Sequence, residues 1–412
     1  MQINSSTFYK ILPNGLKIVH RTTPSEVAYI GIMIGAGTRD EVPELNGLAH
    51  YVEHTVFKGA GKRTARQIIN SIEGIGGEIN AYTTKEETTF YAATPIQHYK
   101  QTLQLLFEMV TQPTFPKKET DKEVGVILDE IESYEDSPAE LIYDDFESLI
   151  FEGHPLAMPI LGTKKTLRKM SSKADFAQQW IKTHFTSERM VVFSQGRIDF
   201  QKVVRFVERL FADTACLPIQ DERTRPCDIM HLSKTLIKRT HQAHALVGGR
   251  AYEIGHPKQL AMYMLNNILG GGSLNSRLNL SLREQKGLVY TIESQFVPLS
   301  DTGYWGIYFA TEPQQREQCL QLIYKELKRL REETMTSLQF QRALTQLHGQ
   351  MAISAENQEN NALAMGKLML YHGIAPTWEE TFEEITKLTP IDLQDVANEL
   401  LTENAISMLF YA

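Results

Sequence analysis

The string His50-Tyr51-Val52-Glu53-His54 places two imidazoles four residues apart. On an α-helix, residues i and i+4 lie on one face, so His50 and His54 can reach one metal ion together. Glu53 lies beside them, close enough to accept a proton from a water molecule at that ion. This HxxEH pattern is the reverse of the HExxH motif of zinc peptidases. The alternative to a metal site is a pair of half-buried histidines beside a solvated glutamate. The apolar residues around the string favour the metal site.

Two histidines leave a zinc ion in need of a third protein ligand, with a fourth position open for water. Glu130 is the best candidate, 130 − 54 = 76 residues beyond His54 on a helix predicted over residues 123–134. Glu123 precedes it by two helical turns and shares its face. We expect the adjacent apolar stripe to bury this face, where a carboxylate is costly unless it is paired or binds metal. Glu123 would then accept the free N–H of a ligand histidine and orient it. Either glutamate alone would be an ordinary surface residue.

An internal repeat divides the chain. Residues 91–106 align without gaps with residues 308–323, at an offset of 308 − 91 = 217, and eight of the sixteen positions are identical. The offset is about half of the 412 residues, which indicates duplication of a whole domain. We predict a zinc-binding domain over residues 1–215, a linker over 216–232 and a homologous domain over 233–412.

Strand and helix patterns are interspersed in both halves. The apolar run 27–37 predicts a buried strand, residues 46–59 a helix, and residues 77–94 a hairpin around Lys85-Glu86. Residues 102–110 and 123–134 have apolar side chains at helical spacing. We therefore predict an α+β fold in which each domain is a mostly antiparallel sheet packed with helices.

Composition narrows the class of protein. A net charge of −8 and a pI near 5.9 argue against nucleic acid or an anionic membrane as the main partner. No apolar run is long enough to span a membrane, and the start of the chain lacks the pattern of a signal peptide. We expect a cytoplasmic, bacterial protein. The chain has three widely spaced cysteines, Cys216, Cys227 and Cys319. An odd number at such spacing is not typical of a disulfide framework, so we expect free thiols.

The HYVEH string, followed by the last glutamate of EVGVILDE, resembles the pitrilysin and insulysin family of inverzincin metallopeptidases. Within it, the chain is similar to the branch that contains mitochondrial processing peptidase and its short bacterial relatives. The similarity covers essentially the whole chain and includes the segments GGEINAYTTKEETTFYAAT, GHPLAMPILGT and LGGGSLNSRLNLSLREQKGLVYTI. Asp129 stands where many relatives have glutamate, one residue from the expected ligand.

The resemblance adds two residues to the site. Arg283 and Tyr290 in LREQKGLVY match the arginine and tyrosine that complete the site in active family members. A guanidinium and a phenol are suitable donors for the negative charge that develops on the carbonyl oxygen during peptide hydrolysis. From the residues alone, Arg283 would be a solvated helix cation and Tyr290 a core residue.

The resemblance also implies how substrate binds. Relatives add an extended peptide as a strand to a sheet edge, and here that edge would include Gly77 to Thr83, with Asn80 and Ala81 nearest the scissile bond. Peptides and unfolded polypeptides are therefore the expected substrates.

Two further acids have a resemblance-based role. Glu140 and Asp144 lie where processing peptidases have acids that favour a basic residue near the cut. A solvated acidic helix face is an equal alternative for this pair.

The resemblance further implies a dimer. Insulysin-type relatives fuse two such halves around a chamber, and this chain corresponds to one half. Because the zinc motif and the Arg283/Tyr290 pair are both present, we expect a homodimer in which the pair from one protomer serves the zinc of the other. A heterodimer with a related subunit is the alternative. The expected activity is that of a zinc endopeptidase with one Zn²⁺ per chain. The rival is a catalytically weak peptide-binding or assembly subunit of the same fold.

Overall fold

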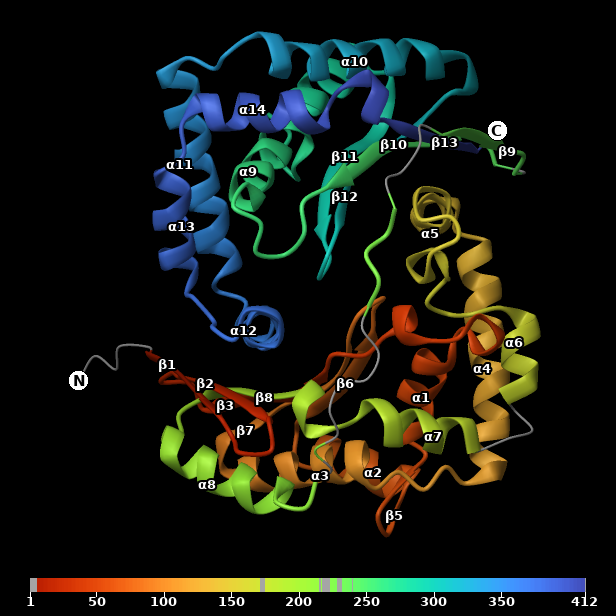
Figure 1. Ribbon diagram of the computed structural model, residues 1–412, viewed down its shortest axis with the longest axis vertical. Coiled ribbons are helices and arrows are strands. Elements are labelled where there is room, and N and C mark those ends of the chain that lie inside the picture. Colours follow the sequence, from red (N-terminus) through yellow and green to blue (C-terminus); the bar gives the residue numbers. More distant parts are fainter. Residues whose placement is uncertain are drawn as a thin grey trace. The chain divides into compact units, whose positions relative to one another are not determined.

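The structure is a computed structural model that describes residues 6–170, 175–214, 216, 223–227, 232–238 and 240–411. It divides into two compact units, each with one large sheet and several helices (Figure 1). Unit 1 comprises Met1–Glu132, Met158–Arg223 and Ala355–Thr377, and unit 2 comprises Ser133–Ala157, Thr224–Ser354 and Trp378–Ala412. The predicted α+β class is confirmed.

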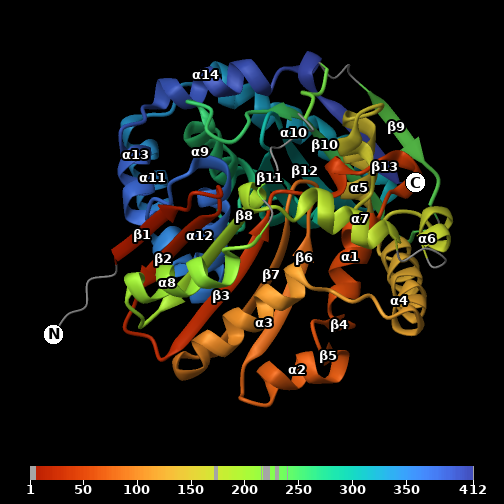
Figure 2. The ribbon, with the colours of Figure 1, turned by 60° about the horizontal axis from the view of Figure 1, so that its bottom comes forward.

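Six strands form the main sheet of unit 1 (Figure 2). All neighbouring strands are antiparallel except β2 and β8, which are parallel. In spatial order the strands are β1 (Ser6–Ile11), β2 (Lys17–Thr22), β8 (Met190–Gly196), β3 (Val27–Ile34), β7 (Thr88–Pro95) and β6 (Glu78–Thr83). Strand β6 is therefore an edge strand, at the place where the sequence predicted a substrate-binding edge.

Helices cover both faces of the unit 1 sheet. Alternate strand residues such as Ile30 and Phe90 face a core shared with most of the helices, whereas Met33 and Phe193 face α12. A Cβ at Gly366 of α12 would lie 2.7 Å from the Phe193 ring, so glycine permits this close contact. The helical elements are η1 (Thr38–Asp40), η2 (Pro43–Leu45), α1 (Leu48–Val56), α2 (Ala65–Glu73), η3 (Ile96–His98), α3 (Tyr99–Thr111), α4 (Lys117–Glu135), α6 (Lys164–Met170), α7 (Asp175–His184), η5 (Ser187–Arg189), α8 (Phe200–Phe211) and α12 (Gln358–His372), with a small sheet of β4 (Gly59–Ala60) and β5 (Arg63–Thr64).

Unit 2 has a five-stranded sheet, antiparallel except for the outer pair β13 and β9. One face packs on α5 and the other on α9, α10, α11, α13 and α14. Its strands in spatial order are β11 (Val289–Pro298), β12 (Gly303–Thr311), β10 (Ala243–Ala251), β13 (Ser407–Tyr411) and β9 (Ser233–Leu236). Its helical elements are α5 (Pro138–Ile150), η4 (Pro155–Ala157), α9 (Gln259–Gly270), η6 (Asn279–Glu284), η7 (Pro313–Gln315), α10 (Arg316–Glu332), α11 (Ser337–Ser354), α13 (Trp378–Thr386), α14 (Pro390–Leu400) and η8 (Glu403–Ala405).

The two halves of the sequence exchange one helix each. Helix α5 comes from the N-terminal half and packs on the unit 2 sheet, and α12 comes from the C-terminal half and packs on the unit 1 sheet. Each sheet has two apolar faces, and the remaining helices of its own half cover only one of them. The compact units therefore depart from the predicted boundaries 1–215 and 233–412 at residues 133–157 and 355–377. The division into homologous domains stays a prediction, and most of the linker 216–232 lies outside the described residues.

The internal repeat corresponds to the same structural motif in both units. Residues 91–106 run from β7 through η3 into α3, and residues 308–323 run from β12 through η7 into α10. The other predicted elements are also confirmed. They are the strand at 27–37 (β3), the helix at 46–59 (α1), the hairpin at 77–94 (β6/β7) and the helices at 102–110 (α3) and 123–134 (α4).

All three cysteines are free. Within the described residues, no helix is long and apolar enough to cross a membrane.

His20 joins strands β2 and β8 in the core of unit 1. Its Nδ1 lies 2.8 Å from Ser194 Oγ and its Nε2 lies 3.0 Å from the carbonyl oxygen of Ile198. Burial lowers the pKa of His20 to about 4, so the imidazole is neutral in the folded protein. The unfolded chain, with an ordinary histidine pKa of about 6.5, binds more protons between about pH 4 and 6.5.

Folding stability should therefore fall as the pH falls through this window. We predict a shallower loss of unfolding free energy between pH 6.5 and 4.5 in His20→Gln than in the unmodified protein, measured by urea unfolding. His241→Gln removes an exposed histidine and should leave the slope unchanged. Equal slopes for all three proteins would contradict the assignment.

Candidate active site

Helix α1 presents His50 and His54 on one face, as their spacing predicted. The two ring centroids lie 4.6 Å apart. Only His54 of the nine helix residues is not buried, so the backbone of this helix is held by packing along its whole length. Burial, followed by the neighbouring His54, lowers the pKa of His50 to about 3. This keeps His50 in the neutral form that binds metal ions.

Glu130 of α4 faces the two histidines. Its Oε2 lies 3.8 Å from His50 Nε2 and 3.6 Å from His54 Nε2. Ligands at about 2.1 Å from one zinc ion can be at most about 4.2 Å apart, so both pairs fit around a single ion. All three ligand atoms lie within 4.8 Å of one another. Two imidazoles and one carboxylate are a donor set typical of catalytic zinc sites.

The expectation that Glu130 is buried is wrong. Its side chain is 43% exposed, whereas that of Glu123 is 11% exposed. Glu123 is buried on the same helix as the buried residues Val124 and Ile127. Glu130 lies four residues after Val126, which is half exposed, and is therefore on a more open part of α4. The Glu130 carboxylate is therefore accessible from solvent.

Glu123 lies where the sequence predicted an orienting carboxylate. Its Oε1 is 3.1 Å from His54 Nδ1, and its Oε2 is 2.7 Å from the ammonium of Lys58. The Glu123 carboxylate thus contacts both the Lys58 ammonium and His54 Nδ1, and His54 Nε2 faces Glu130. Sequence reasoning missed Lys58, which lies in the turn that follows α1, four residues after His54.

Glu53 contacts the edge strand through a short hydrogen bond. Thr83, the last residue of β6, donates its hydroxyl to Glu53 Oε2 at 2.6 Å. Burial raises the pKa of Glu53, the Thr83 bond and His54 oppose this rise, and Glu130 adds to it. A raised pKa brings the carboxyl closer to the range in which it can both take and return a proton. The sequence predicts a substrate-binding role for Thr83, and the structure adds its contact with Glu53, the candidate base.

The other edge residues lie along β6 and just before it. Gly77 precedes the strand, Asn80 is exposed opposite Tyr91, and Ala81 is half-buried opposite Phe90. Among the described residues, β6 is hydrogen-bonded only to β7, so its outer backbone groups are free to pair with another strand.

The predicted residues of unit 2 lie in irregular backbone. Arg283 is in the π-helical segment η6, and Tyr290 lies at a β-bulge between Val289 and Thr291. Tyr290 is 70% exposed, which excludes its interpretation as a core residue. Both kinds of irregularity are common beside functional sites.

The two acids of α5 differ in exposure. Glu140 is exposed, whereas Asp144 is half-buried and, together with Glu140, contributes to raising the pKa of Tyr134, after the larger effect of burial.

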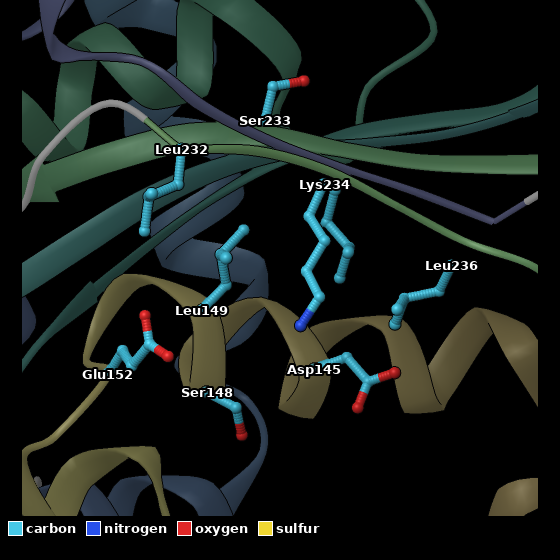
Figure 3. Close-up of a pocket in the computed structure, with 9 residues that line it drawn as sticks. Asp145, Ser148, Leu149, Glu152, Leu232, Ser233, Lys234 and Leu236 are labelled. Carbon is cyan, nitrogen blue, oxygen red and sulfur yellow. The ribbon is translucent and has the colours of Figure 1, made fainter.

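A separate cavity of about 290 Å³ lies between α5 and β9 in unit 2 (Figure 3). Lys234 extends from β9 across the cavity toward α5, the helix that carries Asp145. Asp145 also accepts a hydrogen bond from the Tyr411 hydroxyl at 2.7 Å, which ties α5 to β13. No lining residue belongs to the histidine and glutamate group, and we assign this cavity no chemistry.

The contact between Glu123 and His54 gives a direct test of the site. Glu123→Gln should weaken zinc binding about ten- to hundredfold, because His54 loses a charged acceptor and Lys58 loses its partner. Competition with a chromophoric chelator measures the affinity. Asp121→Asn removes a charge from an exposed position of the same helix and should have no effect. Equal affinities for both variants would show that Glu123 does not orient a ligand.

Two family models match most of the chain. Residues 17–164 match the family model described as insulinase (peptidase family M16), and residues 173–347 match that of the peptidase M16 inactive domain. The chain is 33% identical over 393 residues to the uncharacterized zinc protease YmxG of Bacillus subtilis, covering 95% of each chain. It is 33% identical over 398 residues to an uncharacterized zinc protease of Streptomyces coelicolor, covering 95% of this chain and 86% of that one.

Solved structures show the same fold. A protease from Helicobacter pylori superposes with a TM-score of 0.90 at 20% identity, covering 99% of this chain and 100% of that one. A Pseudomonas fluorescens protein described as a peptidase M16 inactive domain gives 0.91 at 17% identity, covering 99% and 98%. Taken with the full-length similarity to bacterial zinc proteases, these matches show that the chain belongs to the insulinase family of peptidases, family M16.

Proposed function

We propose that this chain is a zinc-dependent endopeptidase that hydrolyses peptides or unfolded polypeptides bound as an extended strand. The observation that supports this most is the hydrogen bond from Thr83 to Glu53. It connects the edge strand to the candidate base, which lies on the same helix as the two histidines. A peptide added to β6 would pass directly beside the acid–base group.

The chemistry assigns a distinct task to each side chain. His50, His54 and Glu130 would hold the zinc ion, which when bound polarises the scissile carbonyl and lowers the pKa of water. Glu53 accepts a proton from the attacking water as the oxygen bonds to the carbonyl carbon. Glu53 then returns that proton to the nitrogen of the leaving amine as the carbon–nitrogen bond breaks.

Substrate contacts are assigned from the edge geometry and the family resemblance. Backbone groups from Gly77 to Thr83 would pair with the peptide, with Asn80 and Ala81 nearest the scissile bond. Glu140 and Asp144 are assigned to a basic residue near the cut.

We propose that the active form is a homodimer. Arg283 and Tyr290 of the partner subunit would then donate hydrogen bonds to the developing oxyanion. Their exposure and irregular backbone leave both side chains available to a bound molecule. A catalytically weak peptide-binding subunit is the competing function, and the complete set of three ligands and a base favours the enzyme.

Glu53→Gln separates catalysis from metal binding. The amide keeps the shape of the side chain but cannot accept the proton, so turnover of a quenched peptide should fall by about two to four orders of magnitude. Zinc content should remain at one ion per chain, and removal of zinc by a chelator should abolish turnover in the unmodified protein. Near-normal activity of Glu53→Gln would refute its role as the base.

Mixing inactive subunits tests the dimer. If one protomer supplies the base and the other supplies Tyr290, a mixture of Glu53→Gln and Tyr290→Phe chains should recover part of the peptidase activity. Up to about a quarter of the sites in a random mixture would pair an intact base with an intact tyrosine. Each variant alone is the control, and a mixture no more active than the variants would show that every protomer works alone.

A further inference from the structure

The two candidate histidine ligands are oriented by different means. His54 Nδ1 has a carboxylate partner in Glu123. His50 Nδ1 is buried and has no hydrogen-bond partner among the described residues. The direction of the His50 ring must therefore come from the backbone of α1 and from packing. His50 is the third residue of this helix, so its position depends on how the first turn is held.

Helix α1 begins without a side-chain cap of its own. Its N-cap residue is Gly47, with φ +92°, and a Cβ there would lie 2.8 Å from the Cα of Gly162. Close packing of these two glycines thus leaves no room for the serine, threonine or aspartate that usually caps a helix. The free N–H groups of the first turn must be satisfied from elsewhere.

Glu41, six residues upstream of the N-cap, satisfies two of these backbone N–H groups. Its Oε1 accepts the N–H of Ala49 at 2.7 Å, and its Oε2 accepts the N–H of Gly47 at 2.8 Å and the side-chain amide of Asn46 at 3.0 Å. Only 6% of Glu41 is exposed. Burial raises the pKa of this carboxyl, and the three donors oppose the rise by stabilising the charged form.

The same short segment also contacts the edge-strand hairpin. Thr38 and Arg39 donate their backbone N–H groups to the carbonyl oxygens of Thr84 and Lys85, at 3.2 and 2.8 Å. The guanidinium of Arg39 lies 2.6 Å from the carboxylate of Glu86, and both side chains are almost fully buried. Residues 38–41 therefore connect the turn after Thr83 to the first turn of the metal-binding helix.

We propose that Glu41 is a positioning residue that acts through His50: it fixes the first turn of α1 and thereby sets the direction of the His50 imidazole. This inference rests on the proposed zinc site and adds the group that orients its second histidine. Glu41 does not touch metal or substrate. Its effect should pass through Ala49, the residue whose N–H it accepts and which directly precedes His50.

Glu41→Gln is the principal test. Glutamine has one oxygen and one NH₂ group where the carboxylate has two acceptors, so at least one donor of the first turn loses its partner. Zinc affinity, measured by chelator competition, should fall about ten- to hundredfold, as for other groups that orient metal ligands. Glu44→Gln, at an exposed position three residues later, is the matched control and should bind zinc normally. Glu41→Asp keeps a carboxyl group on a shorter side chain and should give an intermediate loss.

A double-mutant cycle separates positioning from general stability. In a His50→Ala background, Glu41→Gln should cause no further loss of zinc affinity, since the ligand it positions is gone. In a His54→Ala background the tenfold or greater loss should persist. Equal losses in both backgrounds, or no loss in the single variant, would overturn the proposal.

Hydrogen exchange of the metal-free protein tests independently whether Glu41 holds the first turn of α1. Exchange of the amides in residues 47–54 should be faster in Glu41→Gln than in Glu44→Gln, because the first turn loses its hydrogen bonds. Unchanged exchange would overturn the proposal even if zinc affinity changed. If the unmodified chain binds no zinc, the proposed enzyme function fails, and the exchange rates still decide whether Glu41 holds this turn.

Discussion

The arrangement of the site depends on the fixed position of one nine-residue helix. Helix α1 presents both histidines and the candidate base, and it is buried along almost its whole length. Three separate contacts hold it: Glu41 at its first turn, the edge strand through Thr83, and α4 through Glu123. An ion coordinated by ligands from two helices tolerates displacements of only a few tenths of an ångström, so the ligand geometry requires this many constraints.

The edge strand is held by charges that are unusual for a hairpin turn. Lys85, Glu86 and Glu87 form the tip between β6 and β7, and all three are buried. Glu86 pairs with Arg39 and lies 3.3 Å from Arg223, and Glu87 accepts from Lys367 at 2.7 Å. Both side chains of the Arg39–Glu86 pair are almost fully buried. Removal of one member of such a pair generally costs about 3–5 kcal/mol, so this contact fixes the conformation of the turn.

These contacts also explain why unit 1 needs residues from beyond its own half of the sequence. Lys367 is on α12, and Arg223 lies in the segment that joins the two halves. Arg223 donates to both carboxylate oxygens of Asp40, directly beside Glu41. The exchanged helix therefore buries an apolar sheet face and, through Glu87, stabilises the hairpin that contains the edge strand. Unit 1 is therefore complete only with α12, which comes from the C-terminal half of the chain.

The sequence by itself determined which side chains could form the candidate site. The spacing of His50, Glu53 and His54 fixes their helical face, the heptad from Glu123 to Glu130 fixes the second helix, and the repeat fixes two similar folds, because each is a local property of the chain. Only the tertiary structure decided which groups contact, cap or cover these residues. The exposure of Glu130, the cap supplied by Glu41 and the exchange of α5 and α12 arise from contacts between distant segments, for which local periodicity contains no signal.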